Sequence, residues 1–166
     1  MMRRLFLYLP LVLTLTTAAC NRTQQAVQQP ATDSLSACGP KALSAVISYY
    51  RLTVSWDSLA KVCHTTSKGT SLLELANGAR YLGFDAAGLQ VGYDELDKVP
   101  KPSIVFVNGN HYATLLWSGP DSVLIDDGGV KSFVKKEEFQ KQWGGVVLAL
   151  YPTKELHQRV YKKQGI

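Results

Sequence analysis

The first half of the chain shows apolar residues at helical spacing. The run 42–50 places its large apolar residues on one helical face, directly after Pro40, which is acceptable in a first helical turn. A second helix is predicted over 55–62, opened by a serine cap, and a third over 71–81, opened by the capping pattern Ser-Leu-Leu-Glu. Gly83 then ends the third helix. This half is therefore predicted to be helical.

The second half consists of short β-branched and apolar runs separated by turn residues. Asn108-Gly109 and Asp127-Gly128-Gly129 are strong turn signals. Short helical segments are predicted over 93–96 and 136–143. Strands are predicted over 84–91, 103–107, 112–117, 122–125, 131–134 and 146–151. Helices followed by an antiparallel sheet indicate an α+β fold, with the sheet packed on the first helix.

The N-terminus has the pattern of a secretory signal. Residues 1–19 join two arginines to an apolar run too short for a comfortable membrane span, and small residues then lead into Cys20. This order resembles a bacterial lipoprotein signal, which is cut before a cysteine that is then lipidated. We expect a lipid anchor at Cys20; an ordinary signal peptide with an incidental cysteine is the alternative. Residues 20–34 have almost no apolar content and are predicted to form a flexible tether spanning about 20 Å.

The rest of the 166 residues suffices for one domain, which we place at 35–152, followed by a basic polar tail at 153–166. Loss of the two signal arginines lowers the formal net charge from +5 to +3. Basic residues are not interleaved with aromatic ones, so nucleic-acid binding has no support. The tail is interpreted as a solvated helix end, with contact to anionic lipid as the alternative. Neither CxxC nor HExxH spacing occurs, and we expect no metal or cofactor.

Cys38 is the main candidate for chemistry. It lies directly ahead of the first predicted helix, where unpaired N–H groups and the positive end of the helix dipole favour thiolate over thiol. Its own backbone N–H would suit an oxyanion once a carbonyl is attacked. In a secreted protein a disulfide between Cys38 and Cys63 is a competing interpretation. Cys63 also fits a core position on the second helix.

A thiol nucleophile needs a base, and the base needs an orienting partner. His111 begins one predicted strand and Asp126 ends the next, so neighbouring strands would bring them together. Each also has a simpler interpretation, His111 as a loop residue and Asp126 as a turn residue. His64 and His157 are weaker candidates, near a helix end and in the polar tail. The combination of Cys38, His111 and Asp126 favours a nucleophilic thiol enzyme.

The residues around these positions resemble one peptidase family. The segments in question are Ser36-Ala37-Cys38-Gly39-Pro40-Lys41-Ala42-Leu43 ahead of Tyr49-Tyr50, Gly69-Thr70-Ser71-Leu72, Pro100-Lys101-Pro102-Ser103-Ile104, Asn110-His111-Tyr112 and Ile125-Asp126. In this order they are similar to the bacteriocin-processing peptidases. These are papain-like cysteine peptidases that remove double-glycine leader peptides, usually as the N-terminal domain of an ABC exporter. The resemblance covers essentially Ser34 to Tyr151.

The resemblance implies a papain-like fold, in which N-terminal helices carrying the cysteine pack on a C-terminal sheet carrying the histidine and aspartate. It implies Cys38 as nucleophile, His111 as base and Asp126 as its orienter. Two positions depart from the family pattern. Thr32 stands where the family has an oxyanion-binding Gln, and Gln29 lies three residues too early. Loss of one oxyanion donor costs on the order of 100-fold in rate. Asp127 follows Asp126 where the family has Pro.

We therefore expect a free-standing, membrane-tethered cysteine peptidase of the bacterial cell envelope, facing the periplasm or the exterior. Its partners would be a peptide or protein substrate and, through Cys20, a membrane. A papain-like peptide-binding module impaired by Thr32 is the first alternative. A thiol-dependent peptidoglycan endopeptidase or amide transferase is the second.

Overall fold

The computed structural model describes residues 36–164 of the protein. The predicted signal at 1–19, the lipidation site Cys20 and the tether at 20–34 lie outside the described residues, as do Gln29 and Thr32. Within the described part, no helix has the length and apolar character needed to cross a membrane.

Three helices form the first half, as predicted. They are α1 (Cys38–Tyr49), α2 (Trp56–Val62) and α3 (Leu72–Tyr81). The serine caps predicted for α2 and α3 are present, because Ser55 Oγ accepts from the backbone N–H of Ser58 and Ser71 Oγ from that of Glu74. These local capping signals fix where both helices begin.

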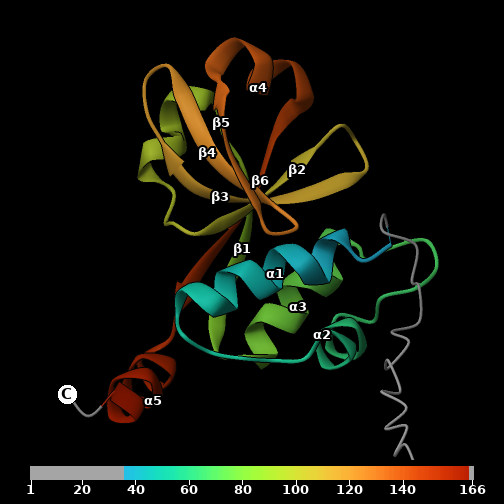
Figure 1. The fold of residues 1–166 in the computed structure, drawn as a ribbon, viewed down its shortest axis with the longest axis vertical. Helices are drawn as coiled ribbons and strands as arrows, with labels where there is room; N and C mark the ends of the chain where they lie inside the picture. Colours follow the sequence, from blue (N-terminus) through green and yellow to red (C-terminus); the bar gives the residue numbers. More distant parts are fainter. Residues whose placement is uncertain (1–35, 165–166) are drawn as a thin grey trace, which may run out of the picture. The chain divides into compact units, whose positions relative to one another are not determined.

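The second half builds one antiparallel sheet of six strands (Figure 1). The order across the sheet is β1-β6-β2-β3-β4-β5. The strands are β1 (Phe84–Gln90), β2 (Ser103–Val107), β3 (His111–Ser118), β4 (Ser122–Asp127), β5 (Val130–Lys135) and β6 (Trp143–Pro152). The α+β fold expected from the sequence is confirmed.

Each face of the sheet carries its own apolar core. One face is covered by α1, α2 and α3, and buries Leu43, Ile47 and Leu148 among others. The other face is covered by the 3₁₀ helix η1 (Tyr93–Lys98) and by α4 (Lys136–Gln142). Figure 1 shows the three N-terminal helices and α4 on different sides of the sheet. The sheet is therefore a central layer, and α1 lies directly on β3.

The structure departs most clearly from the sequence prediction at β6 and in the tail. Trp143 begins β6 rather than ending the preceding helix, and its indole N–H donates to the Val146 carbonyl. The tail contains a further helix, α5 (Lys154–Gln164), whose Leu156 is fully buried. A single buried leucine in a polar segment gives too weak a periodic signal to predict packing.

Candidate active site

Cys38 is the first residue of α1 and its thiol is free. The residue is buried, with 5% of its surface exposed. Gly39 beside it explains how α1 packs here, because a Cβ at this position would lie 3.2 Å from Thr70 Cβ and 3.5 Å from Tyr112 Cδ2. The first turn of α1 is thus held between the segment preceding α3 and the start of β3.

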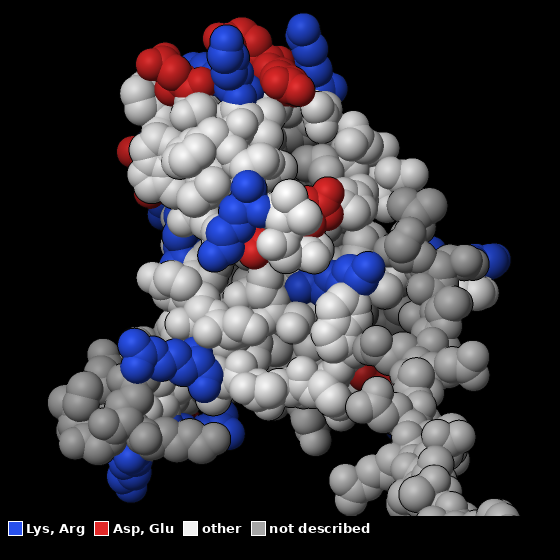
Figure 2. Space-filling view, in the orientation of Figure 1, with Lys and Arg blue, Asp and Glu red and all other residues white. Residues whose placement is uncertain are grey.

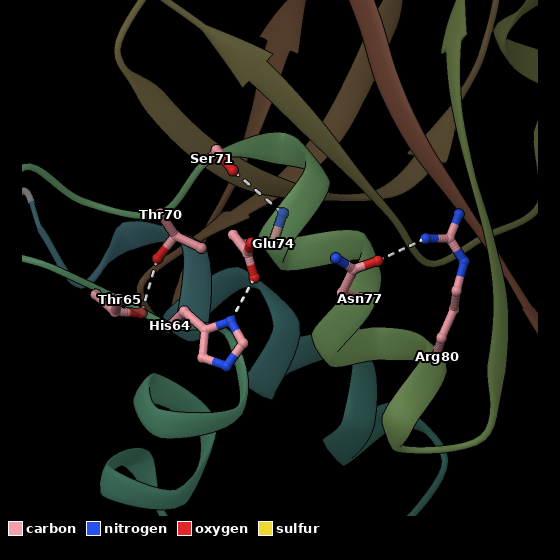
Figure 3. A network of polar contacts seen from close by, with 7 residues as sticks. All are labelled: His64, Thr65, Thr70, Ser71, Glu74, Asn77 and Arg80. Carbon is pink, nitrogen blue, oxygen red and sulfur yellow. Dashed lines mark hydrogen bonds and ion pairs between the residues drawn. The ribbon is translucent and has the colours of Figure 1, made fainter.

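The segment preceding α3 is fixed by polar contacts, shown in Figure 3. Thr70, which touches the first turn of α1, shares a 2.8 Å hydrogen bond between hydroxyls with Thr65. His64 Nδ1 lies 2.6 Å from Glu74 Oε2. Glu74 was expected to complete a capping box at Ser71 and pairs with His64 instead. This network links the loop beside Cys38 to α3.

The second cysteine is unsuited to nucleophilic chemistry. Cys63 is free and completely buried beside α3, where a Cβ added to Gly78 would lie 2.4 Å from its Sγ. Burial, and secondarily the charge of Glu74, raise the pKa of Cys63 to about 11. The disulfide considered as an alternative is absent, since both Cys38 and Cys63 are free thiols.

His111 begins β3, and its ring contacts a carboxylate. Nε2 lies 2.8 Å from Oδ1 of Asp127. Because a carboxylate accepts, Nε2 carries the proton in this contact and Nδ1 is the other ring nitrogen. The imidazole is 23% exposed and the Asp127 side chain 54% exposed. Asp127 therefore orients the ring of His111 in this structure.

Asp126, to which the sequence interpretation gave this contact, has different surroundings. It is 7% exposed, and its Oδ1 accepts a 2.7 Å hydrogen bond from the backbone N–H of Gly129. It closes the turn between β4 and β5, and the expected pairing with His111 is corrected to Asp127. The catalytic role of each carboxylate remains a prediction.

Sheet register explains the correction. Thr114 of β3 pairs with Asp126 of β4. Side chains alternate between faces along each strand, so a β4 residue shares a face with His111 only if its number is odd. Asp127 meets this condition and Asp126 does not. In the sequence, the alternation of Val123, Ile125 and Asp127 indicates that these three residues share a face. It identifies Asp127 as the partner of His111 only once the register between β3 and β4 is known.

The structure brings the start of α1 and the start of β3 together without a bond between thiol and imidazole. Among the described residues, no hydrogen bond joins Cys38 Sγ to His111. The sulfur instead neighbours Tyr112, whose pKa is raised by burial and then by the charge Cys38 would carry as thiolate. Tyr112 directly follows His111. Successive strand residues point to opposite faces, so the imidazole lies on the face of Val107, whereas Tyr112 and Cys38 lie on the face covered by α1. The nucleophile and the base candidate thus lie at adjoining element ends but on different faces of the sheet.

His64 lies in the network beside α3, and His157 lies in α5. Within residues 36–164 no group of three or more His, Cys, Asp or Glu side chains is arranged to hold a metal ion. The candidate site therefore consists of the Cys38 thiol at the start of α1 and the His111 imidazole, hydrogen-bonded to Asp127, at the start of β3.

Comparison with known proteins gives this site a context. The chain is 35% identical over 125 residues to the lactococcin transport/processing ATP-binding protein LcnC-like of Lactococcus lactis subsp. lactis (strain IL1403), covering 70% of this chain and 18% of that protein. It is 28% identical over 148 residues to the transport/processing ATP-binding protein ComA of Streptococcus pneumoniae (strain ATCC BAA-255 / R6), covering 83% and 20%. The chain spans about a fifth of the length of these relatives.

Solved structures show the same fold. The peptidase domain of Streptococcus ComA, a bifunctional ABC transporter, superposes with a TM-score of 0.66 at 26% identity, over 71% of this chain and 93% of that domain. A double glycine motif protease from an AMS/PCAT transporter, in complex with the leader peptide, gives 0.66 at 27%, over 70% and 84%. The model of the peptidase C39 family matches residues 25–155. The chain therefore belongs to the peptidase C39 family.

Proposed function

We propose that this protein is a cysteine peptidase that hydrolyses a peptide bond, with Cys38 as nucleophile and His111 as base. The observation that carries the proposal is the placement of a free thiol at the start of α1 beside Tyr112, whose neighbour His111 is bound to Asp127. Membership of the C39 family supports the same chemistry.

In this proposal each ring nitrogen of His111 has one role. With Nε2 donating to Asp127, Nδ1 is the nitrogen left to take the proton of the Cys38 thiol. This step requires the imidazole to move around the start of β3 toward the face covered by α1, where Cys38 lies. The thiolate attacks the substrate carbonyl, and the backbone N–H of Cys38 stabilises the oxyanion. His111 then protonates the leaving amine, and water releases the acyl group from sulfur. Asp127 stabilises the imidazolium that forms in between.

The substrate proposed first is a peptide with two glycines before the cleaved bond. A similar solved protein is a double glycine motif protease bound to a leader peptide. The sequence pattern at residues 1–34 supports a lipid anchor at Cys20 and an envelope location, with an envelope or secreted polypeptide as the target. Both the substrate and the anchor belong to this proposal.

A second candidate function is peptide binding without cleavage. It is favoured by one observation, the absence of a hydrogen bond from Cys38 Sγ to His111 in the described structure, together with the burial of that thiol. The departure at Thr32 would act in the same direction, since it removes the family's second oxyanion donor.

The proposal is tested by labelling and turnover of the same protein. A peptide ending in Gly-Gly and carrying a thiol-reactive vinyl sulfone should label the protein and its Cys63→Ala variant, but not Cys38→Ala. Cleavage of a double-glycine peptide, followed by mass spectrometry, should show the same dependence. Equal labelling of Cys38→Ala would overturn the assignment of the nucleophile. Binding of the intact peptide without products would select the second candidate.

A further inference from the structure

The helix α5 supplies all of the net charge of the described domain. Between Ser36 and Thr153 the acidic and basic side chains balance, with eleven of each. The sequence of α5 contains three lysines and one arginine against the single acid Glu155. The family match ends at residue 155, so this basic helix lies almost wholly beyond the domain common to the family.

The way α5 packs leaves Lys154, Arg159 and Lys162 exposed. Leu156 is buried, and Arg159 Nη2 lies 3.5 Å from the carbonyl of Leu82. In Figure 2 blue side chains lie around α5, whereas at the opposite end of the molecule, near η1 and α4, acidic side chains lie among basic ones. The positive surplus of the described residues therefore lies at α5.

Three exposed tyrosines lie in segments that adjoin this helix. Tyr49 is 64% exposed and lines a cavity of about 190 Å³ with Arg51 and Leu156, between the end of α1 and α5. Tyr81, 79% exposed, directly precedes Leu82, which Arg159 approaches. Tyr151, 46% exposed, is the second-last residue of β6, the strand that leads into α5. Tyrosines and lysines together are the residues found where proteins meet the membrane–water interface.

We propose that α5 and the tyrosines beside it form a surface that binds the anionic headgroups of a phospholipid bilayer. Each lysine or arginine near an anionic bilayer contributes favourably to the free energy of membrane binding, and this attraction decays within a Debye length. The exposed tyrosines favour a bilayer over other polyanions, because a tyrosine ring can lie at the level of the lipid headgroups while its hydroxyl stays hydrated.

Binding through this surface would also orient the domain relative to the bilayer. Tyr49 ends α1 and Cys38 begins it, so the two ends of the helix are about 18 Å apart at the rise of an α-helix. A domain resting on α5 would hold the thiol end of α1 away from the bilayer. A peptide in the surrounding solution would then have access to Cys38.

Vesicle binding of the full chain tests the surface. Sedimentation with pure phosphatidylglycerol vesicles at low salt is compared between the wild type and the double variant Lys154→Glu with Lys162→Glu. Two cations are lost from the interface, and we expect affinity to fall about 30-fold or more. The matched control is Lys98→Glu with Lys141→Glu, which changes the net charge equally on exposed positions of η1 and α4.

The control is expected to stay within about threefold of the wild type, because its charges lie away from the proposed surface. Binding to pure phosphatidylcholine vesicles should be the same for all three proteins, since any apolar contribution of the N-terminal segment is common to them. Thermal unfolding by circular dichroism establishes that each variant is folded. Equal losses of affinity for phosphatidylglycerol vesicles in the two double variants, or no loss of affinity in the α5 variant, would overturn the proposal.

Discussion

Asp126 and Asp127 are neighbours in the chain but make different contacts at the start of the β4–β5 turn. Asp127 holds the imidazole of His111, and Asp126 holds the backbone N–H of Gly129. Strand alternation separates them, since consecutive residues point to opposite faces. A carboxylate that orients a base affects rate, whereas one that closes a turn affects stability.

Replacing Asp127 and Asp126 one at a time by alanine should therefore separate an effect on catalytic rate from an effect on stability. Asp127→Ala frees the imidazole, and we expect kcat/KM for a double-glycine peptide to fall about tenfold or more, which is part of the roughly 100- to 10,000-fold that a positioned acid–base group contributes. Asp126→Ala removes a hydrogen bond from a buried group, and we expect about 1 kcal/mol less stability in thermal unfolding. Peptide cleavage and melting are measured on both variants. A larger loss of rate in Asp126→Ala would return the orienting role to Asp126.

At the scale of elements, the packing of α2 and α3 explains why one cysteine is inert. Gly78 allows α3 to approach the end of α2 so closely that its missing Cβ would lie 2.4 Å from Cys63 Sγ. The thiol is therefore enclosed, and burial raises its pKa from 9.0 to about 11. A charged thiolate in that position would lose its hydration without gaining a cation.

We predict that Cys63 resists alkylation at neutral and mildly alkaline pH. With a pKa of about 11, only about one thiol in a thousand is ionised at pH 8. Its rate of modification in the Cys38→Ala variant should rise about tenfold per pH unit and level off only above about pH 11. The raised pKa also means that its contribution to stability is complete below pH 9.0 and declines as the pH rises toward 11. Mass spectrometry after iodoacetamide treatment gives the rates, and rapid modification near pH 8 would contradict this packing.

Local signals in the sequence were sufficient for most elements. Ser55 and Ser71 each cap a helix through a contact three residues away, and so their effect can be predicted without tertiary information. The partner of His111 could not be predicted in the same way. It depends on the register between β3 and β4, and the choice between two adjacent aspartates reverses with a shift of one residue.

At the scale of the whole molecule, packing extends beyond what the sequence pattern and the family match indicate. The contact of Gly39 with Thr70 and Tyr112 joins three segments that are distant in the chain, so no local pattern reports it. The tail likewise has mostly polar residues, and the sequence interpretation treated it as solvated. Its helix nevertheless joins the core that α1, α2 and α3 share, through Leu156.

Burial of Leu156 implies that α5 is part of the cooperative fold. Its side chain is 1% exposed and lies over Gly83, at the junction of α3 and β1. Leu156→Ala would leave a cavity there, and we expect unfolding to cost about 2 kcal/mol less than in the wild type. Gln158→Ala, at an exposed position of the same helix, should change stability by less than about 0.5 kcal/mol. Urea unfolding followed by circular dichroism measures both. If Leu156→Ala leaves the transition of the domain unchanged, α5 unfolds independently and the basic surface is only loosely attached to the peptidase fold.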